Sequence, residues 1–370
     1  MLYKLKDILT EFKELNIDSK FTPVAVGRYG IRDRREIYKK ELSNDYSKNK
    51  VIRKNNLIIG LGSVQIDVGV LCNDNVYSVS PAYHTYLIDT SIVLPKFLEF
   101  VFKVNNLTWF DKYSVPAARQ GRKMDLESLF DEKINVPSIE IQKILISKIN
   151  YILNLIYTNE NEIICLNELI KSRFNDMFLP NKYNTVTMKE LSTAKAEYGA
   201  SSASMTFDPS RPRYVRITDI NDDGTLNNDN VSSKNISDDT KYKLSYGDFL
   251  FARMGNTVGK TYTHYSGNEI FAGYLIRYKL KLSIINPTYL FYYTKNKEYN
   301  QWVDSNKSGS GQPGINAKKF NLLEIPLPPI ELQNEFAAFV ELIDKLKFNV
   351  QKRIDLYQEL LDKKMDEYFG

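Results

Sequence analysis

Cysteine and histidine are scarce in this 370-residue sequence, and their scarcity excludes several kinds of site. The two cysteines, Cys72 and Cys165, stand far apart without Cys-x-x-Cys spacing, and His84 and His264 are the only histidines. A structural zinc site needs four Cys or His ligands in paired spacings, so the sequence predicts none. Two isolated cysteines also predict no disulfide scaffold and fit a reducing cytoplasm.

Long apolar runs are absent as well. No stretch approaches the roughly 18 consecutive apolar residues that a membrane-spanning helix needs. Charges interrupt residues 1–7, so we expect no signal peptide, no membrane contact and a cytoplasmic location. The hydrophobic and charged fractions, 43% and 26%, are typical of folded proteins, and 370 residues suffice for two domains with separate cores.

Positive charge is modest in total but clustered along the chain. The net charge is +5, and many tyrosines and phenylalanines accompany the basic residues. Clustered Arg and Lys beside aromatic rings are typical of surfaces that bind a phosphate backbone, although solvated surface charge is an equal alternative for any one cluster. The clusters are Arg28, Arg32, Arg34, Arg35, Lys39, Lys40, Lys48, Lys50 and Arg53; Arg119, Arg122 and Lys123; and Arg211, Arg213 and Arg216.

The chain contains an internal repeat whose two copies keep one register. Residues 134–142 read Ile-Asn-Val-Pro-Ser-Ile-Glu-Ile-Gln, and residues 325–333 read Ile-Pro-Leu-Pro-Pro-Ile-Glu-Leu-Gln. The ungapped match extends over about 45 residues, and two copies are too few for a solenoid, so it predicts a pseudo-twofold molecule. The offset of 191 positions joins Gln142 with Gln333, Ile163 with Ile354, and Phe178 with Phe369.

A coiled-coil stripe of apolar residues follows each copy. Apolar steps of three and four predict two helices of roughly 40 residues, each preceded by proline at Pro137 or Pro328. Such a helix needs a partner of similar length, and the other copy is the obvious one, with self-association of two chains as the alternative. The first stripe is bridged by Asn159 and Glu160, and Cys165 on it is expected in the core.

The two globular parts share a plan while their surface residues differ. Residues 214–217 alternate like a strand, and Pro287 opens an aromatic helix that Pro95 matches in the first half. The glycine-rich stretch 308–316 corresponds to residues 117–125. A duplicated scaffold with diverged surfaces predicts two related but distinct recognition tasks.

Four motifs follow one another in the second half of the chain. They are Tyr-Val-Arg-Ile-Thr-Asp-Ile at 214–220, Gly-Asp-Phe-Leu-Phe-Ala-Arg-Met-Gly at 247–255, Ser-Gly-Gln-Pro-Gly-Ile-Asn at 310–316, and residues 325–333. In this order they resemble the specificity subunit of type I restriction–modification systems, and the resemblance covers essentially the whole chain, twice. The first half departs from the pattern, with Pro-Val-Ala-Val at 23–26 and Arg-Gln-Gly at 119–121.

This resemblance implies an α+β protein with two similar mixed α/β target-recognition domains, separated by two long helices in an antiparallel coiled coil. The expected parts are a first domain at 1–136, a spacer helix at 137–180, a second domain at 181–327 and a second spacer helix at 328–370. Each domain would read one half of a split, asymmetric DNA site, and the helices would fix the gap between the halves.

The resemblance also implies partners. These are double-stranded DNA, two modification subunits that bind S-adenosylmethionine and methylate adenine, and restriction subunits that use ATP to translocate and cleave DNA. Neither a cofactor nor a metal nor catalysis is expected in this chain, so it would be a non-catalytic subunit of a methyltransferase and endonuclease complex.

Base reading needs Arg, Lys, Asn or Gln presented from loops, because bidentate contacts to base edges carry the discrimination. The residue types do not separate base contacts from phosphate contacts. A surface charge or strand-end residue is the alternative for each. The candidates for DNA contact are Arg213, Arg216, Arg253, Asn256 and Lys260 in the second domain, and Arg28, Arg32, Arg34, Arg119 and Arg122 in the first.

Several catalytic motifs are present only in incomplete form. Asn286-Pro287-Thr288-Tyr289 lacks the second proline of the Asn-Pro-Pro-Tyr motif of adenine methyltransferases, and we interpret it as a helix start. Residues 60–63 lack the third glycine of a dinucleotide site, and residues 255–261 are one residue short of a Walker loop. The backbone amides of residues 255–261 could still bind phosphate groups of DNA.

Two functions from other classes are the alternatives. A self-contained DNA methyltransferase or nuclease would need complete cofactor or metal motifs. A coiled-coil scaffold that does not read DNA would need only the long helices.

Overall fold

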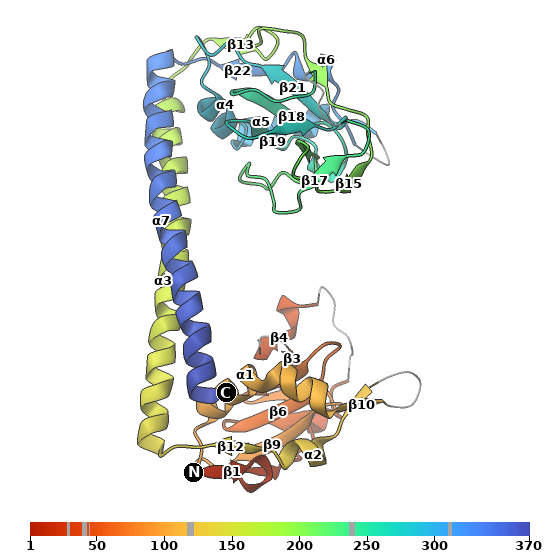
Figure 1. The fold of residues 1–370 in the computed structure, drawn as a ribbon, viewed down its shortest axis with the longest axis vertical. Helices are drawn as coiled ribbons and strands as arrows, with labels where there is room; N and C mark the ends of the chain where they lie inside the picture. The colour runs from red at the N-terminus through yellow and green to blue at the C-terminus, as the bar shows by residue number, and fades with distance from the viewer. Residues whose placement is uncertain (28–29, 39–42, 44, 117–121, 237–240, 310–312) are drawn as a thin grey trace. The chain divides into compact units, whose positions relative to one another are not determined.

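The computed structural model describes residues 1–370 except 28–29, 39–42, 44, 117–121, 237–240 and 310–312. The chain forms two compact units (Figure 1): unit 1 comprises Met1–Glu160 and Gln351–Gly370, and unit 2 comprises Asn161–Val350. Each unit has a mixed α/β globular part and a stretch of both long helices, α3 (Ile139–Phe178) and α7 (Ile330–Phe369). The predicted α+β class is confirmed.

Unit 1 is built on a four-stranded antiparallel sheet with α1 (Pro95–Tyr113) against it. The strand order is β2 (Leu9–Glu11), β9 (His84–Ile88), β6 (Asn56–Leu61) and β7 (Ile66–Val70). Antiparallel pairs join β1 (Leu2–Lys4) to β12 (Lys133–Asn135), β3 (Val24–Gly27) to β4 (Gly30–Asp33), β5 (Lys50–Ile52) to β8 (Tyr77–Val79), and β10 (Ser114–Pro116) to β11 (Arg122–Met124). Short helices are η1 (Leu5–Asp7), η2 (Ile17–Ser19), η3 (Arg34–Glu36) and α2 (Leu126–Phe130).

Unit 2 has two four-stranded sheets. One has the order β14 (Glu197–Tyr198), β21 (Leu275–Lys279), β18 (Asp248–Ala252) and β19 (Thr261–Thr263). The other has the order β15 (Ser204–Thr206), β17 (Val231–Ser233), β16 (Arg213–Val215) and β20 (Glu269–Phe271), and β13 (Thr185–Thr187) pairs with β22 (Glu324–Pro326). The helices are η4 (Gly255–Thr257), α4 (Pro287–Tyr293), α5 (Lys297–Asn306) and α6 (Ala317–Phe320).

The internal repeat of the sequence has a structural counterpart. In unit 1, β1 pairs with β12 so that Leu2 lies opposite Asn135, and in unit 2, β13 pairs with β22 so that Thr185 lies opposite Pro326. The sheet β2-β9-β6-β7 and the sheet β14-β21-β18-β19 follow the same order along the chain. Both halves therefore fold around one plan.

A buried glutamine anchors the start of α3 to unit 1. The Gln142 side chain is fully buried. Its Oε1 accepts a hydrogen bond from the Leu94 N–H (2.7 Å), and its Nε2 donates to the carbonyl groups of Ile92 and Pro137 (both 2.8 Å). One side chain thus satisfies three backbone groups just ahead of two helices, which would otherwise lack partners.

Gln333 repeats this arrangement at the start of α7 in unit 2. Its Oε1 accepts from the Asn286 N–H (2.8 Å), and its Nε2 donates to the carbonyl groups of Ile284 (3.1 Å) and Pro328 (2.8 Å). The glutamine that the sequence repeat places at both positions therefore has the same structural role in both units.

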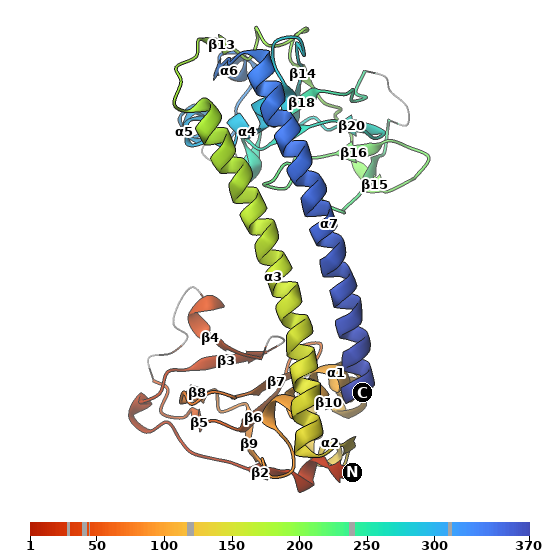
Figure 2. The same cartoon turned by 90° about the vertical axis from the view of Figure 1, so that its left-hand side faces the viewer.

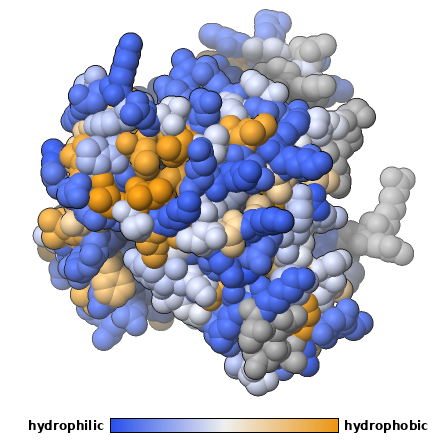
Figure 3. Space-filling model, turned by 90° about the horizontal axis from the view of Figure 1, so that it is seen from above, coloured by the Kyte–Doolittle hydropathy of each residue, from blue (hydrophilic) through white to orange (hydrophobic). Residues whose placement is uncertain are grey.

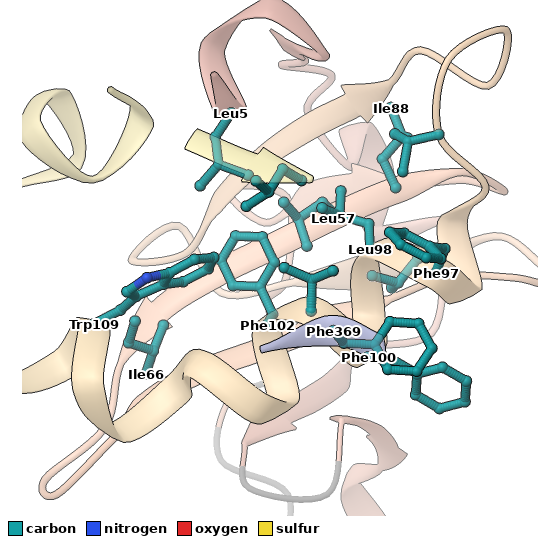
Figure 4. Close-up of a cluster of buried hydrophobic side chains, with 14 of the residues drawn as sticks. Leu5, Leu57, Ile66, Ile88, Phe97, Leu98, Phe100, Phe102, Trp109 and Phe369 are labelled. Atoms are coloured by element: carbon teal, nitrogen blue, oxygen red, sulfur yellow. The ribbon is translucent and has the colours of Figure 1, made fainter. Parts of the chain in front are cut away.

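The last residues of each long helix are buried in an aromatic core. Phe369 of α7 packs in unit 1 against Phe97 and Phe100 of α1, with ring centroids 5.0 and 5.1 Å apart (Figure 4). Phe178 of α3 packs in unit 2 against Tyr289 of α4, with centroids 4.8 Å apart. Aromatic pairs contribute about 0.5–1.5 kcal/mol beyond the area they bury, so these contacts help to fix both helix ends.

Within each unit the two long helices run side by side (Figure 2). In unit 1 the first half of α3, with Ile149 and Ile156, shares a core with the last turns of α7, with Leu361 and Met365. In unit 2 the second half of α3 shares a core with the first turns of α7 around Phe336. The pairing of early with late turns confirms the predicted antiparallel coiled coil.

Individual positions on the first stripe depart from expectation. Cys165 is exposed, so the expectation of a core cysteine is wrong. Successive helix residues are 100° apart, and the neighbouring Leu166 takes the half-buried position instead. Asn159 is buried in the seam, where its Oδ1 accepts from the Arg353 Nε (2.8 Å) and its Nδ2 donates to the Leu155 carbonyl (2.7 Å).

Two local predictions can be compared directly with the structure. Helix α4 begins at Pro287, and the Asn286 Oδ1 caps it by accepting from the Thr288 N–H (2.9 Å), which confirms the helix start. The strand expected at 214–217 ends at Val215, because the Arg216 N–H donates to a side chain, that of Asp219, and leaves the ladder.

No helix of the described ranges is long and apolar enough to cross a membrane. The face seen from above in Figure 3 is mostly hydrophilic, with apolar side chains gathered in a limited patch.

Replacing Gln333 with leucine should destabilise unit 2 by about 2–5 kcal/mol, because each buried group left without a partner costs about 1–3 kcal/mol. Urea unfolding followed by tryptophan fluorescence measures this. Trp109 lies in unit 1 and Trp302 in unit 2, and the chain has no third tryptophan, so a Trp109→Phe background isolates unit 2.

Gln301→Leu is the matched control, since Gln301 is an exposed helical glutamine of the same unit. Its effect should stay within about 0.5 kcal/mol. Equal effects of the two substitutions would contradict the anchoring role of Gln333.

Candidate nucleic-acid interface

Arg253 lies where strand β18 ends and the loop to β19 begins. The Gly255 N–H donates to the Pro313 carbonyl (2.9 Å), which ties this loop to the stretch around Gly314. A Cβ on Gly314 would lie 2.7 Å from the Met254 Sδ and 3.1 Å from the Arg253 carbonyl oxygen, so a larger residue there would crowd this contact. Two motifs that are separate in the sequence therefore form one surface.

The Arg253 guanidinium packs against two tyrosine rings. Its Cζ lies 5.0 Å from the ring centroid of Tyr198 and 5.7 Å from that of Tyr274, within the range of cation–π attraction. Its Nε donates to the Gly273 carbonyl (3.1 Å), and the Tyr198 hydroxyl accepts from the Ala317 N–H (3.1 Å). We call Arg253, Tyr198 and Tyr274 the Arg253 cluster.

The side chains of Arg216 and Lys260 are paired with carboxylates. The Arg216 Nη2 donates to Asp219 Oδ1 (2.7 Å) and Asp229 Oδ2 (2.9 Å), and Asp219 is fully buried. Hydrogen bonding to Asp219 raises the pKa of Arg216. The Lys260 Nζ lies 2.8 Å from Asp222 Oδ1 and lowers the pKa of that carboxyl. A contact with DNA by either cation would require exchange of these partners.

Arg213 and Asn256 occupy different environments. The Arg213 Nη2 donates to the Asn227 carbonyl (2.7 Å), while its Nε is buried without a partner among the described residues. Asn256 is exposed in η4, on the same loop as Arg253. The structure thus presents Asn256 to solvent and uses Arg213 to hold a neighbouring loop.

In unit 1, Arg34 repeats the association with tyrosine. Its Cζ lies 5.7 Å from the ring centroid of Tyr38 and 5.4 Å from that of Tyr46. Arg32 is half-buried on β4. Arg28 lies outside the described residues.

Arg122 begins strand β11 at the base of a hairpin. It is exposed, its Nη2 donates to the Ser114 carbonyl (2.9 Å), and its Cζ lies 5.4 Å from the Phe110 ring centroid. Arg119 lies outside the described residues. Of the predicted contacts, the structure thus joins Arg253 and Asn256 on one loop and leaves Arg122 on the surface of unit 1.

The tyrosines that hold the arginines were missed by the sequence reasoning. Tyr198, Tyr274, Tyr38 and Tyr46 are four of 25 tyrosines, and nothing local marks them. Tyr198 meets Arg253 only because β14 and β18 both pair with β21. An excess of tyrosine near basic clusters was the available signal, and it did not identify the pairs.

A groove of about 2080 Å³ lies within unit 2, between the long helices and the globular part. Its lining carries both signs of charge, with Lys171 and Lys345 beside Glu168 and Asp344. A phosphate backbone needs an excess of positive charge, which this lining does not have. The groove therefore does not match a DNA site as well as the Arg253 cluster does.

A buried polar set lies behind these loops. The Glu269 Oε2 accepts from the Tyr262 hydroxyl (2.7 Å) and lies 3.0 Å from the His264 Nδ1. Burial raises the pKa of Tyr262, and all three side chains are buried. No group of three His, Cys, Asp or Glu able to hold a metal ion occurs in the part of the chain that the structure describes.

The second half of the chain resembles known proteins in sequence, and the whole chain resembles solved structures in fold. The model of the type I restriction modification DNA specificity domain matches residues 180–358. The type I restriction enzyme MjaVIII specificity subunit of Methanocaldococcus jannaschii is 28% identical over 142 residues, which are 38% of this chain and 32% of that protein. The chain thus aligns with about a third of that relative's length.

Two solved structures share the fold over the full length. A chain from work on complex assembly and conformational transition of the type I R-M system has a TM-score of 0.62 at 16% identity, covering 100% of this chain and 97% of that one. The type I restriction-modification S subunit from M. genitalium has a TM-score of 0.55 at 13% identity, covering 100% and 96%. Over residues 180–358, this chain is therefore similar to the family of type I restriction modification DNA specificity domains.

Proposed function

We propose that this chain is the subunit that confers DNA specificity on a type I restriction–modification complex. The observation that carries the proposal is the family match over residues 180–358, the region that contains the Arg253 cluster. The repeated plan of unit 1 supports a second reading domain. Together they would bind the two halves of a split, asymmetric double-stranded site.

The chemistry is assigned to partner subunits. Two modification subunits would bind S-adenosylmethionine and methylate adenine, and restriction subunits would use ATP to translocate and cleave. This chain would direct both reactions without catalysing either. Arg216 and Lys260 are paired with carboxylates, while Arg253 is packed against tyrosine rings, and this mixture suits a protein that combines phosphate positioning with base reading.

The proposed function predicts one methylation motif. In cells that express this chain with its modification subunit, long-read mapping of methylated adenines should give a single split, asymmetric motif with a gap of constant length. Replacing Arg253 and Arg119 together with alanine should abolish it, because each half would lose a contact. Arg173→Ala, which removes a surface ion pair with Glu335 on the long helices, is the control and should preserve the motif.

Methylation that continues unchanged when this chain is absent would contradict the proposal. It would reduce the chain to a scaffold.

The purified chain tests the two alternative functions. It should bind double-stranded DNA with an affinity that falls as salt rises, with a slope of log K against log salt of about −0.9 for each neutralised phosphate. With S-adenosylmethionine added it should transfer no methyl group until the modification subunit is supplied. Methylation by the chain alone would establish a self-contained methyltransferase, and the absence of DNA binding would favour a scaffold.

A further inference from the structure

We propose that Arg253 reads a guanine in the half-site bound by unit 2, as a guanidinium whose orientation is set before DNA binds. This inference rests on the proposed function and goes further, because it assigns one base to one side chain. Residue type alone does not say whether an arginine contacts a base or a phosphate, and the inference makes that choice for Arg253.

The surroundings of Arg253 determine which of its edges can meet a ligand. The rings of Tyr198 and Tyr274 pack against the guanidinium, and the Nε–H is used by the Gly273 carbonyl. Among the described residues the two Nη atoms have no hydrogen-bond partner, and no carboxylate forms a salt bridge with Arg253. The terminal Nη1/Nη2 edge is therefore the available donor pair.

Such an edge matches the O6 and N7 atoms of guanine, which accept two hydrogen bonds side by side in the major groove. A phosphate contact needs only positive charge near the oxygen atoms, and a mobile lysine or arginine supplies it. The two tyrosine rings and the hydrogen bond to the Gly273 carbonyl restrict rotation of the Arg253 guanidinium. This restriction favours a directional pair of hydrogen bonds to a base more than it favours attraction to a phosphate charge.

The three other cations predicted to contact DNA in unit 2 are less suited to this role. Arg216 and Lys260 are held by Asp219 and Asp222. Arg213 uses its Nη2 on the Asn227 carbonyl. Arg253 is thus the arginine among these candidates that combines a fixed plane with an unused fork.

Strand β6 holds the same place in the sheet of unit 1 as β18 holds in unit 2, and the link that follows β6, residues 62–65, contains no arginine. The link from β6 to β7 is Gly62–Gln65, shorter than the link from β18 to β19, which runs from Arg253 to Lys260. A change at Arg253 should therefore alter one half of the motif and leave the other half as an internal reference.

The test uses the intact complex, co-expressed in cells whose methylated adenines are mapped by long reads. Arg253→Lys keeps the charge and removes the fork. One guanine position in one half of the motif should become degenerate, with its preference over other bases reduced roughly tenfold or more. The other half and the gap length should be unchanged.

Two substitutions of Tyr274 test the positioning role of the ring. Tyr274→Leu removes the ring and should relax the same guanine position. Tyr274→Phe keeps the ring and should leave the motif intact. Trp302 fluorescence during urea unfolding checks that unit 2 of each variant is folded.

Different results separate the two levels of the proposal. A wild-type motif without a G·C pair in either half, or an unchanged motif with Arg253→Lys, would overturn the guanine assignment while leaving the specificity function standing. Uniformly weaker methylation of an unchanged motif in Arg253→Ala would identify a phosphate contact and also overturn it. Methylation independent of this chain would instead overturn the proposed function.

Discussion

The rest of the structure depends on how the two long helices bury their apolar stripes. A 40-residue helix cannot bury a stripe against itself, so each needs apolar partners along its whole length. In unit 1, early turns of α3 and late turns of α7 share a core with α1, and in unit 2, late turns of α3 and early turns of α7 share a core with α4. Neither globular part completes its core without a helix that also belongs to the other unit. Gln142 and Gln333 fix where the two helices start, and Phe178 and Phe369 fix where they end.

Under the proposed function, duplication would let one scaffold carry two reading surfaces. The sheet order, the terminal strand pairs and the glutamine anchors are common to both units, because they serve the core. The loops that face solvent differ, as the link after β18 is longer than the link after β6. Loops can change in this way without cost to the core, since their side chains contribute little to it. Under the proposed function, that separation would allow distinct half-sites to be read from a common frame.

Much of the frame could be predicted from the sequence, because apolar periodicity reports directly on burial. The stripes predicted both long helices, and the prolines predicted the starts of α1 and α4. The state of each arginine could not be predicted in the same way. Arg216 is paired with a buried aspartate three residues away, and Arg253 is held by tyrosines that reach it through the sheet. Such contacts depend on tertiary structure, and they produce no periodic pattern in the sequence. The candidate residues were chosen by chemical type, and only the structure shows which of them are paired with carboxylates and which are packed against tyrosine rings.

The most direct test of the account is a domain exchange. Residues 181–327 would be replaced by the corresponding segment of a relative with a different methylation motif, with both long helices retained, and methylated adenines would be mapped in cells that contain the modification subunit. The account predicts a hybrid motif in which one half is new and the other half is unchanged. Alteration of both halves, or of neither, would contradict the claim that each unit reads its own half-site.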